Sequence, residues 1–307
     1  MARKLRIQYE GAIYHVINRG NYRRDVFESV GAAQAFEEAL KEACAANGWR
    51  MHAYVIMRNH YHLVVETPRA NLVEGMHWLQ STFATRFNRL RKERGHLFQG
   101  RYQALLIENT AALANVVDYV HLNPVRAKII GAEQLGGFRW SSLRRFMREG
   151  RTAWLSCADW LAQRGFADSE SGWRDYLAYL IGLAADEDAQ KRLGLVGLSV
   201  GWAIGSNGWK RALAQDHAQR ALAPGIEAGE LKELKMAHWS QVLDAELRRA
   251  GKTKEDARVE INGAPWKIQA AIRLRGEGAP YAWITEMLSM GKVSSVRAYM
   301  AKAKSSI

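Results

Sequence analysis

The sequence predicts an α+β protein in which a ferredoxin-like split βαβ sandwich is followed by a mainly helical region. Up to about residue 126, β-branched runs and helical patterns alternate in the order β-α-β-β-α-β-α, which is the order of such a sandwich with one added helix. Beyond about residue 130 the pattern is mainly helical, without clear strands. The length of 307 residues and the hydrophobic content of 48% allow two domains with real cores. We place the boundary between residues 1–145 and 146–307.

The first half of the sandwich is predicted from four segments. Residues 12–18 form a β-branched run, and residues 31–47 carry apolar side chains at a spacing of four, which indicates a helix. Gly48 stands where helices commonly end in a left-handed residue. Residues 49–57 read as a second strand, and a short connection predicts that the strand from His60 is its antiparallel hairpin partner.

The second half of the sandwich begins after Pro68, which ends the hairpin. Asn71 is placed to cap a long helix that runs to about Arg94. Residues 98–108 contain a fourth strand, and residues 110–122 read as a third helix. The long helix has an apolar stripe at helical spacing, formed by Leu72, Met76, Leu79, Phe83, Phe87 and Leu90.

The C-terminal region carries one recognisable pattern. Residues 224–307 are almost entirely helical in pattern, and residues 281–303 within them read as helix, tight turn and helix. Gly291 in the turn and a basic second helix fit a helix-turn-helix, although an ordinary helical hairpin gives the same pattern. We therefore predict that residues 146–307 form a helical DNA-binding region.

The composition favours a polyanionic partner. The formal net charge is +13 and the pI is about 9.8, which favours nucleic acid. Residues 1–150 contribute +9 and the rest +4, so the N-terminal half is the better candidate for phosphate contact. Cys44 and Cys157 stand far apart in apolar surroundings, which predicts reduced, buried thiols and a cytoplasmic protein. No secretory signal or membrane span is expected.

The strongest chemical pattern is His60-Tyr61-His62, at the start of a β-branched run. Side chains alternate across a strand, so the two imidazoles face one side and Tyr61 faces the other. Two nitrogen donors on one face can share a metal ion, although a strand that merely contains two histidines gives the same pattern. Structural zinc is disfavoured because the chain has two cysteines and no Cys-x-x-Cys pair.

A second pattern pairs Tyr119 with Asn123, which share a helix face if the helix continues that far. Pro124 disfavours helical geometry at Asn123, which can instead cap a new short helix. A phenol is a weak nucleophile until it is activated, and a metal that polarises a phosphate lowers that barrier. Phenol attack leaves a covalent phosphotyrosine, which strand transfer needs and hydrolysis does not. We prefer Tyr119 to Tyr61 because Tyr61 faces away from the histidines.

In this order the motifs resemble the single-tyrosine HUH transposases and, more closely, the REP-associated tyrosine transposases. The resemblance is strong over about residues 5–145 and weak beyond them. Tyr61 departs from the family pattern, in which that position is usually a bulky hydrophobic residue. The motifs that carry the resemblance are Tyr14–Asn21, His60–His62, Leu97–Tyr102, Tyr119–Ala127, Trp140–Ser142 and Trp202–Ser206.

The resemblance implies the HUH nuclease fold and a transposase that cleaves and joins single-stranded DNA beside repetitive extragenic palindromic (REP) hairpins. It implies that Tyr119 is the catalytic nucleophile, which forms a 5′-phosphotyrosine, and that His60, His62 and Asn123 bind the metal. It favours Mg²⁺ or Mn²⁺ as cofactor, whereas imidazoles alone also suit zinc or other transition metals. A monomer and a homodimer both stay open, and in a dimer the tyrosine can act on its partner's histidines.

DNA contact is predicted for two basic segments. The loop that follows the first strand joins cations to an amide and an aromatic ring, which can contact and stack bases; a solvated basic loop is the alternative. The predicted DNA-binding residues are Arg19, Asn21, Tyr22, Arg23, Arg24 and Arg101. Two other functions fit parts of the pattern: a DNA-binding regulator without cleavage activity, and another HUH nuclease such as a replication initiator or relaxase.

Overall fold

The computed structural model describes residues 7–148, 153–195, 197–216 and 228–304. These residues form two compact units, residues 7–206 and residues 207–304. The predicted α+β class is confirmed, because the first unit contains a five-stranded sheet with helices and the second is helical. None of the described helices combines the length and the apolar character that a membrane span needs.

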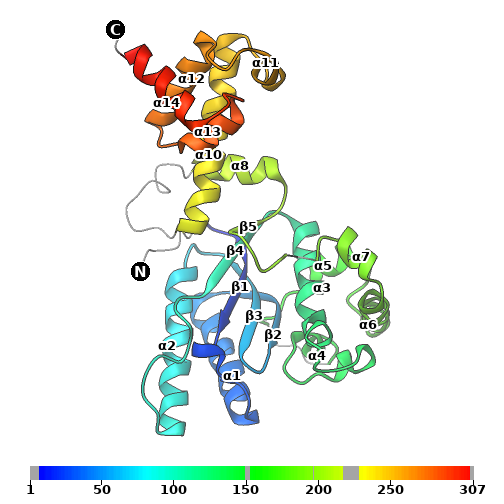
Figure 1. Ribbon diagram of the computed structural model, residues 1–307. Coiled ribbons are helices and arrows are strands. Elements are labelled where there is room, and N and C mark those ends of the chain that lie inside the picture. Colours follow the sequence, from blue (N-terminus) through cyan, green and yellow to red (C-terminus); the bar gives the residue numbers. More distant parts are fainter. Residues whose placement is uncertain (1–6, 149–152, 196, 217–227, 305–307) are drawn as a thin grey trace. The chain divides into compact units, whose positions relative to one another are not determined.

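The first unit is built on one mixed sheet with the strand order β2-β3-β1-β4-β5 (Figure 1). The first four strands are antiparallel to their neighbours, and β2 and β3 form the predicted hairpin. β5 is parallel to β4; it was not predicted, because two residues carry no periodic pattern. The strands are β1 (Ala12–Arg19), β2 (Arg50–Ile56), β3 (His60–Thr67), β4 (Gln103–Ile107) and β5 (Ala203–Ile204).

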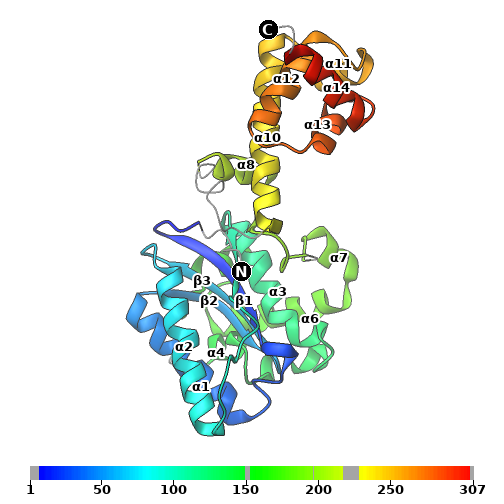
Figure 2. The ribbon, with the colours of Figure 1, turned by 60° about the vertical axis from the view of Figure 1, so that its left-hand side comes forward.

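Helices cover both faces of this sheet (Figures 1 and 2). On one face, α1 (Val30–Asn47) and α2 (Leu72–Arg91) pack through aromatic rings. The ring centroids of Tyr61 in β3 and Phe36 in α1 are 4.6 Å apart. On the other face, Val55 and Val64 pack against the buried residues of α3 (Thr110–Arg126). Because side chains alternate along β3, the histidines that flank Tyr61 face α3.

Two details of α1 and α2 bear on the sequence-based expectations. α1 ends, as predicted, at Gly48, whose φ of 68° suits a residue without a side chain. The predicted α2 stripe is buried except for Leu90, which is 74% exposed in the last turn of a helix that ends before Arg94. Asn71 precedes α2 but does not cap it, because its side chain instead binds the Trp49 indole at 2.9 Å.

α3 runs without interruption through Pro124 to Arg126. Asn123 therefore lies inside the helix and does not cap a new one. Pro124 lacks the N–H that would bind the carbonyl of Val120, and the Asn123 amide donates to the carbonyl of Tyr119 at 3.3 Å. Tyr119 and Asn123 consequently lie one turn apart on the same face of α3.

The chain after α3 packs back onto it and extends the first unit to residue 206. The core shared with α3 includes Trp160, Trp173 and Tyr176. The functional boundary after residue 145 stays a prediction. The elements of this part are the 3₁₀ helix η2 (Ala132–Gly137), α4 (Ser142–Phe146), α5 (Ala158–Gln163), α6 (Glu170–Ala185) and α7 (Glu187–Arg192).

A buried polar network fastens α3 to these helices. The Asp118 carboxylate is fully buried and accepts hydrogen bonds from Tyr176 at 2.8 Å, Tyr179 at 2.9 Å and Arg164 at 2.8 Å. Since the Tyr176 hydroxyl donates to Asp118, it accepts from Nδ1 of His121 at 3.0 Å. The position of α3, and with it that of Tyr119, therefore depends on residues beyond 145.

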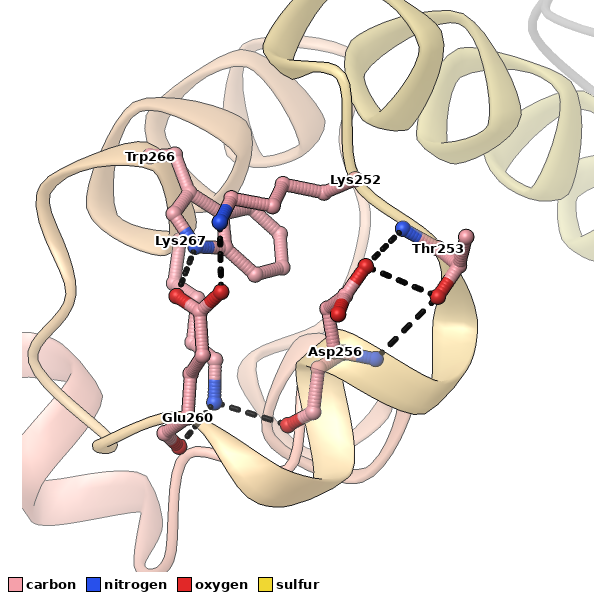
Figure 3. Close-up of polar contacts among 7 residues, drawn as sticks. Lys252, Thr253, Asp256, Glu260, Trp266 and Lys267 are labelled. Atoms are coloured by element: carbon pink, nitrogen blue, oxygen red, sulfur yellow. Dashed lines mark hydrogen bonds and ion pairs between the residues drawn. The ribbon is translucent and has the colours of Figure 1, made fainter.

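The described part of the second unit is a helical bundle in which the Lys267 side chain is buried. Nζ of Lys267 donates to the carbonyls of Ala257 and Glu260, so it satisfies the C-terminal end of α11, while the Glu260 carboxylate binds Lys252 and Trp266 (Figure 3). The described helices are α8 (Asn207–Asp216), α10 (Ala228–Ala250), α11 (Lys254–Val259), α12 (Pro265–Gly276), α13 (Tyr281–Met287) and α14 (Val293–Lys304).

The segment predicted as helix, tight turn and helix contains α13 and α14. In the turn, Ser289 and Gly291 have φ values of 49° and 81°, and the glycine takes this left-handed geometry without strain. Ile284, Leu288 and Val296 are fully buried and hold the two helices together.

Candidate active site

The paired histidines lie at the N-terminal end of β3, in the middle of the sheet. His60 pairs with Arg19 of β1, and His62 pairs with Ile17 on one side and Val55 on the other. The centroids of the two imidazole rings are 5.2 Å apart. Two imidazoles that each bind one ion at about 2.1 Å place their centroids about 5 Å apart, so the spacing fits a shared metal.

Hydrogen bonds assign the tautomer of His60. Its Nδ1 lies 2.7 Å from Oδ1 of Asn59, which can only accept, so Nδ1 carries the proton. The Asn59 amide nitrogen is directed to the carbonyl of Arg23, which supports this orientation of the side chain. Nε2 of His60 is therefore left with a lone pair that can bind a metal.

A chain of three groups assigns the tautomer of His62. The carbonyl of Leu198 accepts from Nδ1 of His15 at 2.8 Å, so Nε2 of His15 carries a lone pair. That nitrogen lies 2.9 Å from Nδ1 of His62, which must therefore be the donor. Nε2 of His62 is left as a second free lone pair. His15 thus orients the ring of His62 and sets which nitrogen can bind an ion, as a residue behind a metal ligand commonly does.

Burial keeps these imidazoles neutral. It lowers the pKa of His15 to about 4, and burial together with the charge of Arg19 lowers the pKa of His60 to about 4. The pKa of His62 lies well below its ordinary value, first because of burial and then because of the neighbouring His15, His60 and Arg19. Neutral rings have the lone pairs that a metal needs.

The phenol of Tyr119 reaches this site from α3 of the same chain. Its ring centroid lies 5.7 Å from that of His62 and 5.8 Å from that of His15, and the residue is 9% exposed. The Arg126 guanidinium lies over the tyrosine ring at 5.3 Å and donates to Gln190 at 2.5 Å. The structure thus brings Tyr119 and His62 together without a partner subunit.

The candidate donors from the protein are fewer than the shell of a Mg²⁺ or Mn²⁺ ion needs. Among the described residues, no group of three or more His, Cys, Asp or Glu side chains is placed to hold an ion. The candidate ligands are Nε2 of His60, Nε2 of His62 and the amide oxygen of Asn123, whose nitrogen is used by the Tyr119 carbonyl. Phosphate oxygens and water would fill the rest, as is common for Mg²⁺ and Mn²⁺.

Three other polar side chains near the histidines or Tyr119 in the sequence lie outside the site. Tyr61 is fully buried on the opposite face, and its hydroxyl accepts from Gln80 at 2.8 Å. Glu66 binds His52 and Arg50. His121 is held by Tyr176 and Ser142, so neither of its nitrogens is free.

The two basic segments lie together beside the histidines. The backbone of Gly20 bonds to Asn59, next to His60, and that of Asn21 bonds to Leu97. The segment 97–101 therefore runs along the end of β1, so Arg101 is near the first loop. Arg19, Arg23 and Arg101 are exposed, Asn21 is half-buried, and Arg24 is paired with Glu93 at 2.6 Å. Arg24 is therefore engaged by a carboxylate of the protein.

Tyr22 is presented to solvent by a strained backbone. It is 93% exposed, and both Tyr22 and Arg23 are in the left-handed region, with φ of 51° and 59°. Non-glycine residues rarely adopt this geometry, and such strain tends to persist at functional positions. An exposed ring held beside a site of this kind is suited to stacking on a base.

Replacing Tyr22 by glycine should therefore separate stability from DNA affinity. Glycine tolerates the left-handed geometry, so the free energy of unfolding should stay the same or rise by about 1 kcal/mol. Loss of the stacking surface should cost about 1–3 kcal/mol of binding to a single-stranded oligonucleotide, measured by fluorescence anisotropy. Tyr22→Trp, which keeps an aromatic face, serves as the control. Wild-type affinity for Tyr22→Gly would show that the ring does not contact DNA.

The buried histidines predict a loss of stability in acid. Burial lowers the pKa of His15 to about 4 and that of His121 to about 3, whereas in the unfolded chain both titrate near 6.5. Below pH 6.5 the unfolded chain binds more protons than the folded chain. The free energy of unfolding should therefore decrease by about 1.4 kcal/mol for each histidine and for each unit by which the pH is lowered, down to about pH 4.

Urea unfolding at several pH values, with EDTA present, measures this slope. His15→Gln, which removes one of the buried titrating histidines, should reduce the slope by about 1.4 kcal/mol per pH unit. A free energy of unfolding that stays constant between pH 6.5 and 4 would contradict the burial of these neutral rings.

Two features of the site were not identified from the sequence. The sequence allows His15 a place behind the metal ligands but favours a core or surface role, because its partner Leu198 is 183 residues away and contributes a backbone oxygen. Arg126 lies within the motif Tyr119–Ala127, but no local pattern indicates that its guanidinium covers the ring of Tyr119.

Comparison with protein families gives a match within the first unit. Residues 8–123 match the protein family described as "Transposase IS200 like"; these residues include Tyr119, both histidines and Asn123. No curated protein matches the chain.

Two solved structures are similar to part of it. One, described as "Structure of the REP associates tyrosine transposase bound to a REP hairpin", is 18% identical, with a TM-score of 0.42, and the match covers 50% of this chain and 88% of that one. A protein from Deinococcus radiodurans R1 assigned as a transposase is 21% identical over 41% of this chain and 92% of its own, with a TM-score of 0.29.

Proposed function

We propose that this chain acts as a transposase of the IS200-like family, which residues 8–123 match and whose members cut and rejoin single-stranded DNA through a tyrosine nucleophile. It is a metal-dependent single-stranded DNA endonuclease and strand transferase. The observation that carries the proposal is the placement of the Tyr119 ring 5.7 Å from His62, whose free nitrogen points away from His15. His60, with its own free nitrogen, completes the pair.

The cleavage step is a transesterification at one phosphodiester. The Tyr119 oxygen attacks the phosphorus, the bond from phosphorus to the 3′ oxygen breaks, and the phenol proton ends on the departing 3′ hydroxyl. The product is a 5′-phosphotyrosine, and attack by a second 3′ hydroxyl reverses the step and joins two strands. His60, His62 and Asn123 would hold Mg²⁺ or Mn²⁺, which when bound polarises the phosphate.

Each residue of the site has a role in this step. His15 holds His62 in the tautomer that leaves Nε2 free. Arg126 restricts the Tyr119 ring from one side and adds positive charge beside the attacked phosphate. Arg19, Arg23 and Arg101, with Asn21 and Tyr22, are assigned to the flanking strand, and Arg24 contributes through its partner Glu93 to the shape of the loop.

We also assign the finer fold and target on this basis. The strand order β4-β1-β3-β2 is that of the ferredoxin-like split βαβ sandwich on which HUH nucleases are built. The substrate is single-stranded DNA that carries a REP-like hairpin. Residues 1–145 supply the catalytic residues, and α13 and α14 act as a helix-turn-helix in which exposed Arg297 faces duplex DNA.

Covalent trapping tests the proposal. The full-length chain is incubated with Mn²⁺ and a labelled oligonucleotide that carries a hairpin and single-stranded flanks, and products are separated under denaturing conditions. We expect a labelled protein adduct with the wild type and with Tyr61→Phe, which loses a phenol on the far face of β3. Tyr119→Phe should bind the DNA but form no adduct. Cleavage by Tyr119→Phe at the wild-type rate would overturn the assignment.

The same experiment, together with a comparison of binding to duplex DNA, discriminates between this proposal and the rival function. A DNA-binding regulator without cleavage activity predicts that neither the wild type nor Tyr61→Phe forms an adduct, and that duplex DNA is bound more tightly than the hairpin with single-stranded flanks.

A further inference from the structure

A cavity of about 300 Å³ in the first unit is lined by four arginines, Arg139, Arg144, Arg145 and Arg148. Arg139 follows η2, Arg144 and Arg145 belong to α4, and Arg148 follows α4, in a part of the chain that lies against the β2 edge of the sheet. None of them belongs to the histidine site or to the basic loops beside it. Four cations around one cavity repel one another, so such an arrangement is most stable when an anion occupies it.

Two of the four guanidinium groups are held in place by the fold. Arg145 makes two hydrogen bonds to the buried Glu37 of α1, at 3.1 and 2.5 Å, and Glu37 is fixed in turn by the hydroxyl of Tyr54. The Arg139 guanidinium lies 4.7 Å from the ring centroid of Trp140. A pre-oriented guanidinium loses less conformational entropy when it binds a ligand.

The other two carry charge that the protein does not neutralise. Within the part of the chain that the structure describes, Arg144 and Arg148 have no carboxylate within ion-pair distance, and Arg148 is exposed. Glu37 balances one of the four charges. The cavity therefore keeps an excess of positive charge, in a geometry whose planar donors match phosphate oxygens.

The cavity lies within reach of DNA bound at the histidines. Ile56 of β2 donates to the carbonyl of Trp140 at 2.9 Å, Val55 pairs with Ser141, and Val55 also pairs with His62. The segment that carries Arg139 is thus two strand spacings from β3, about 10 Å. At the duplex rise of about 3.4 Å per nucleotide this distance is about three nucleotides, and it is fewer for a more extended single strand.

We propose that this arginine cavity is a second DNA-binding site, which takes backbone phosphates a few nucleotides from the one that Tyr119 attacks. The inference rests on the proposed function, because DNA at the histidines sets the distance. Guanidinium groups aimed at phosphates contribute affinity and position, and they do not read sequence. The site would hold the strand in register while the covalent bond to Tyr119 exists.

The salt dependence of binding tests this proposal. The probe is the oligonucleotide with a hairpin and single-stranded flanks, and binding to the full-length chain is measured in EDTA, so that no cleavage occurs. Loss of two phosphate contacts in Arg144→Ala/Arg148→Ala should make the slope of log K against log salt less steep by about 1.4 to 1.8. The affinity at low salt should fall at least tenfold.

A matched double variant controls for net charge. Arg174→Ala/Arg192→Ala removes two exposed arginines of α6 and α7 in the same unit and should leave the slope unchanged. Thermal unfolding verifies that both double variants are folded. A wild-type slope for Arg144→Ala/Arg148→Ala, or an equal change in the control, would overturn the proposal.

The outcome is separable from that of the proposed function. If the wild type forms no adduct but the slope still falls in Arg144→Ala/Arg148→Ala, the cavity binds DNA and the cleavage assignment is wrong. If the adduct forms at Tyr119 and the slope does not change, the cleavage assignment stands and the cavity does not contact DNA.

Discussion

Replacing Asp118 by alanine is expected to lower the free energy of unfolding of the first unit by about 3–5 kcal/mol. The carboxylate is fully buried, forms an ion pair with Arg164 at 2.7 Å, and accepts from two tyrosine hydroxyls. Its removal leaves a largely buried guanidinium and two hydroxyls without their acceptor, and each such loss is costly. For a unit of this size the melting temperature should fall by about 10 °C.

Two variants make this measurement specific. Asp175→Ala removes an equal charge from an exposed position on α6 and should change the free energy of unfolding by less than about 0.5 kcal/mol. Asp118→Asn keeps the shape of the side chain but not its charge, so its stability should lie between those of Asp118→Ala and the wild type. A melting temperature for Asp118→Ala close to that of the wild type would show that the network does not fasten α3.

Replacing His15 by phenylalanine is expected to weaken Mn²⁺ binding by about 10- to 100-fold, measured without DNA. The phenyl ring fills similar space but offers no acceptor to Nδ1 of His62, so the ring of His62 loses the partner that fixes its tautomer. Electron paramagnetic resonance of free Mn²⁺ measures the affinity directly. It does not depend on cleavage.

His15→Gln provides the discriminating control. Its amide oxygen can accept from His62 while its nitrogen donates to the carbonyl of Leu198, so most of the Mn²⁺ affinity should return. A purely structural role for His15 predicts instead that both variants bind Mn²⁺ in proportion to their stability. Equal Mn²⁺ affinities for His15→Phe and the wild type would show that His15 does not set the tautomer of His62.

The features that followed from the sequence are those set by local periodicity. Alternation along β3 correctly separated Tyr61 from the histidines. Helical spacing predicted one face for Tyr119 and Asn123 if the helix continued through Pro124, and α3 does so. Gly48 ended α1 as expected, because glycine has no side chain to disfavour the left-handed geometry in which helices commonly end.

What could not be predicted depends on contacts distant in the sequence. The partner of His15 is the carbonyl of Leu198, and the partners of Asp118 are Arg164, Tyr176 and Tyr179. No sequence pattern marks a backbone oxygen as a partner. Asn71 was misjudged for a similar reason, because a distant indole competes for its side chain.

The most direct test of the central claim is to identify the residue that becomes linked to DNA. The wild-type chain is incubated with Mn²⁺ and the hairpin oligonucleotide, digested with protease and nuclease, and analysed by tandem mass spectrometry. The account predicts a 5′-phosphonucleotide on Tyr119, in the peptide that contains Asn123. A nucleotide on Tyr22, Tyr61 or any other side chain would contradict it, as would cleaved DNA without a covalent adduct.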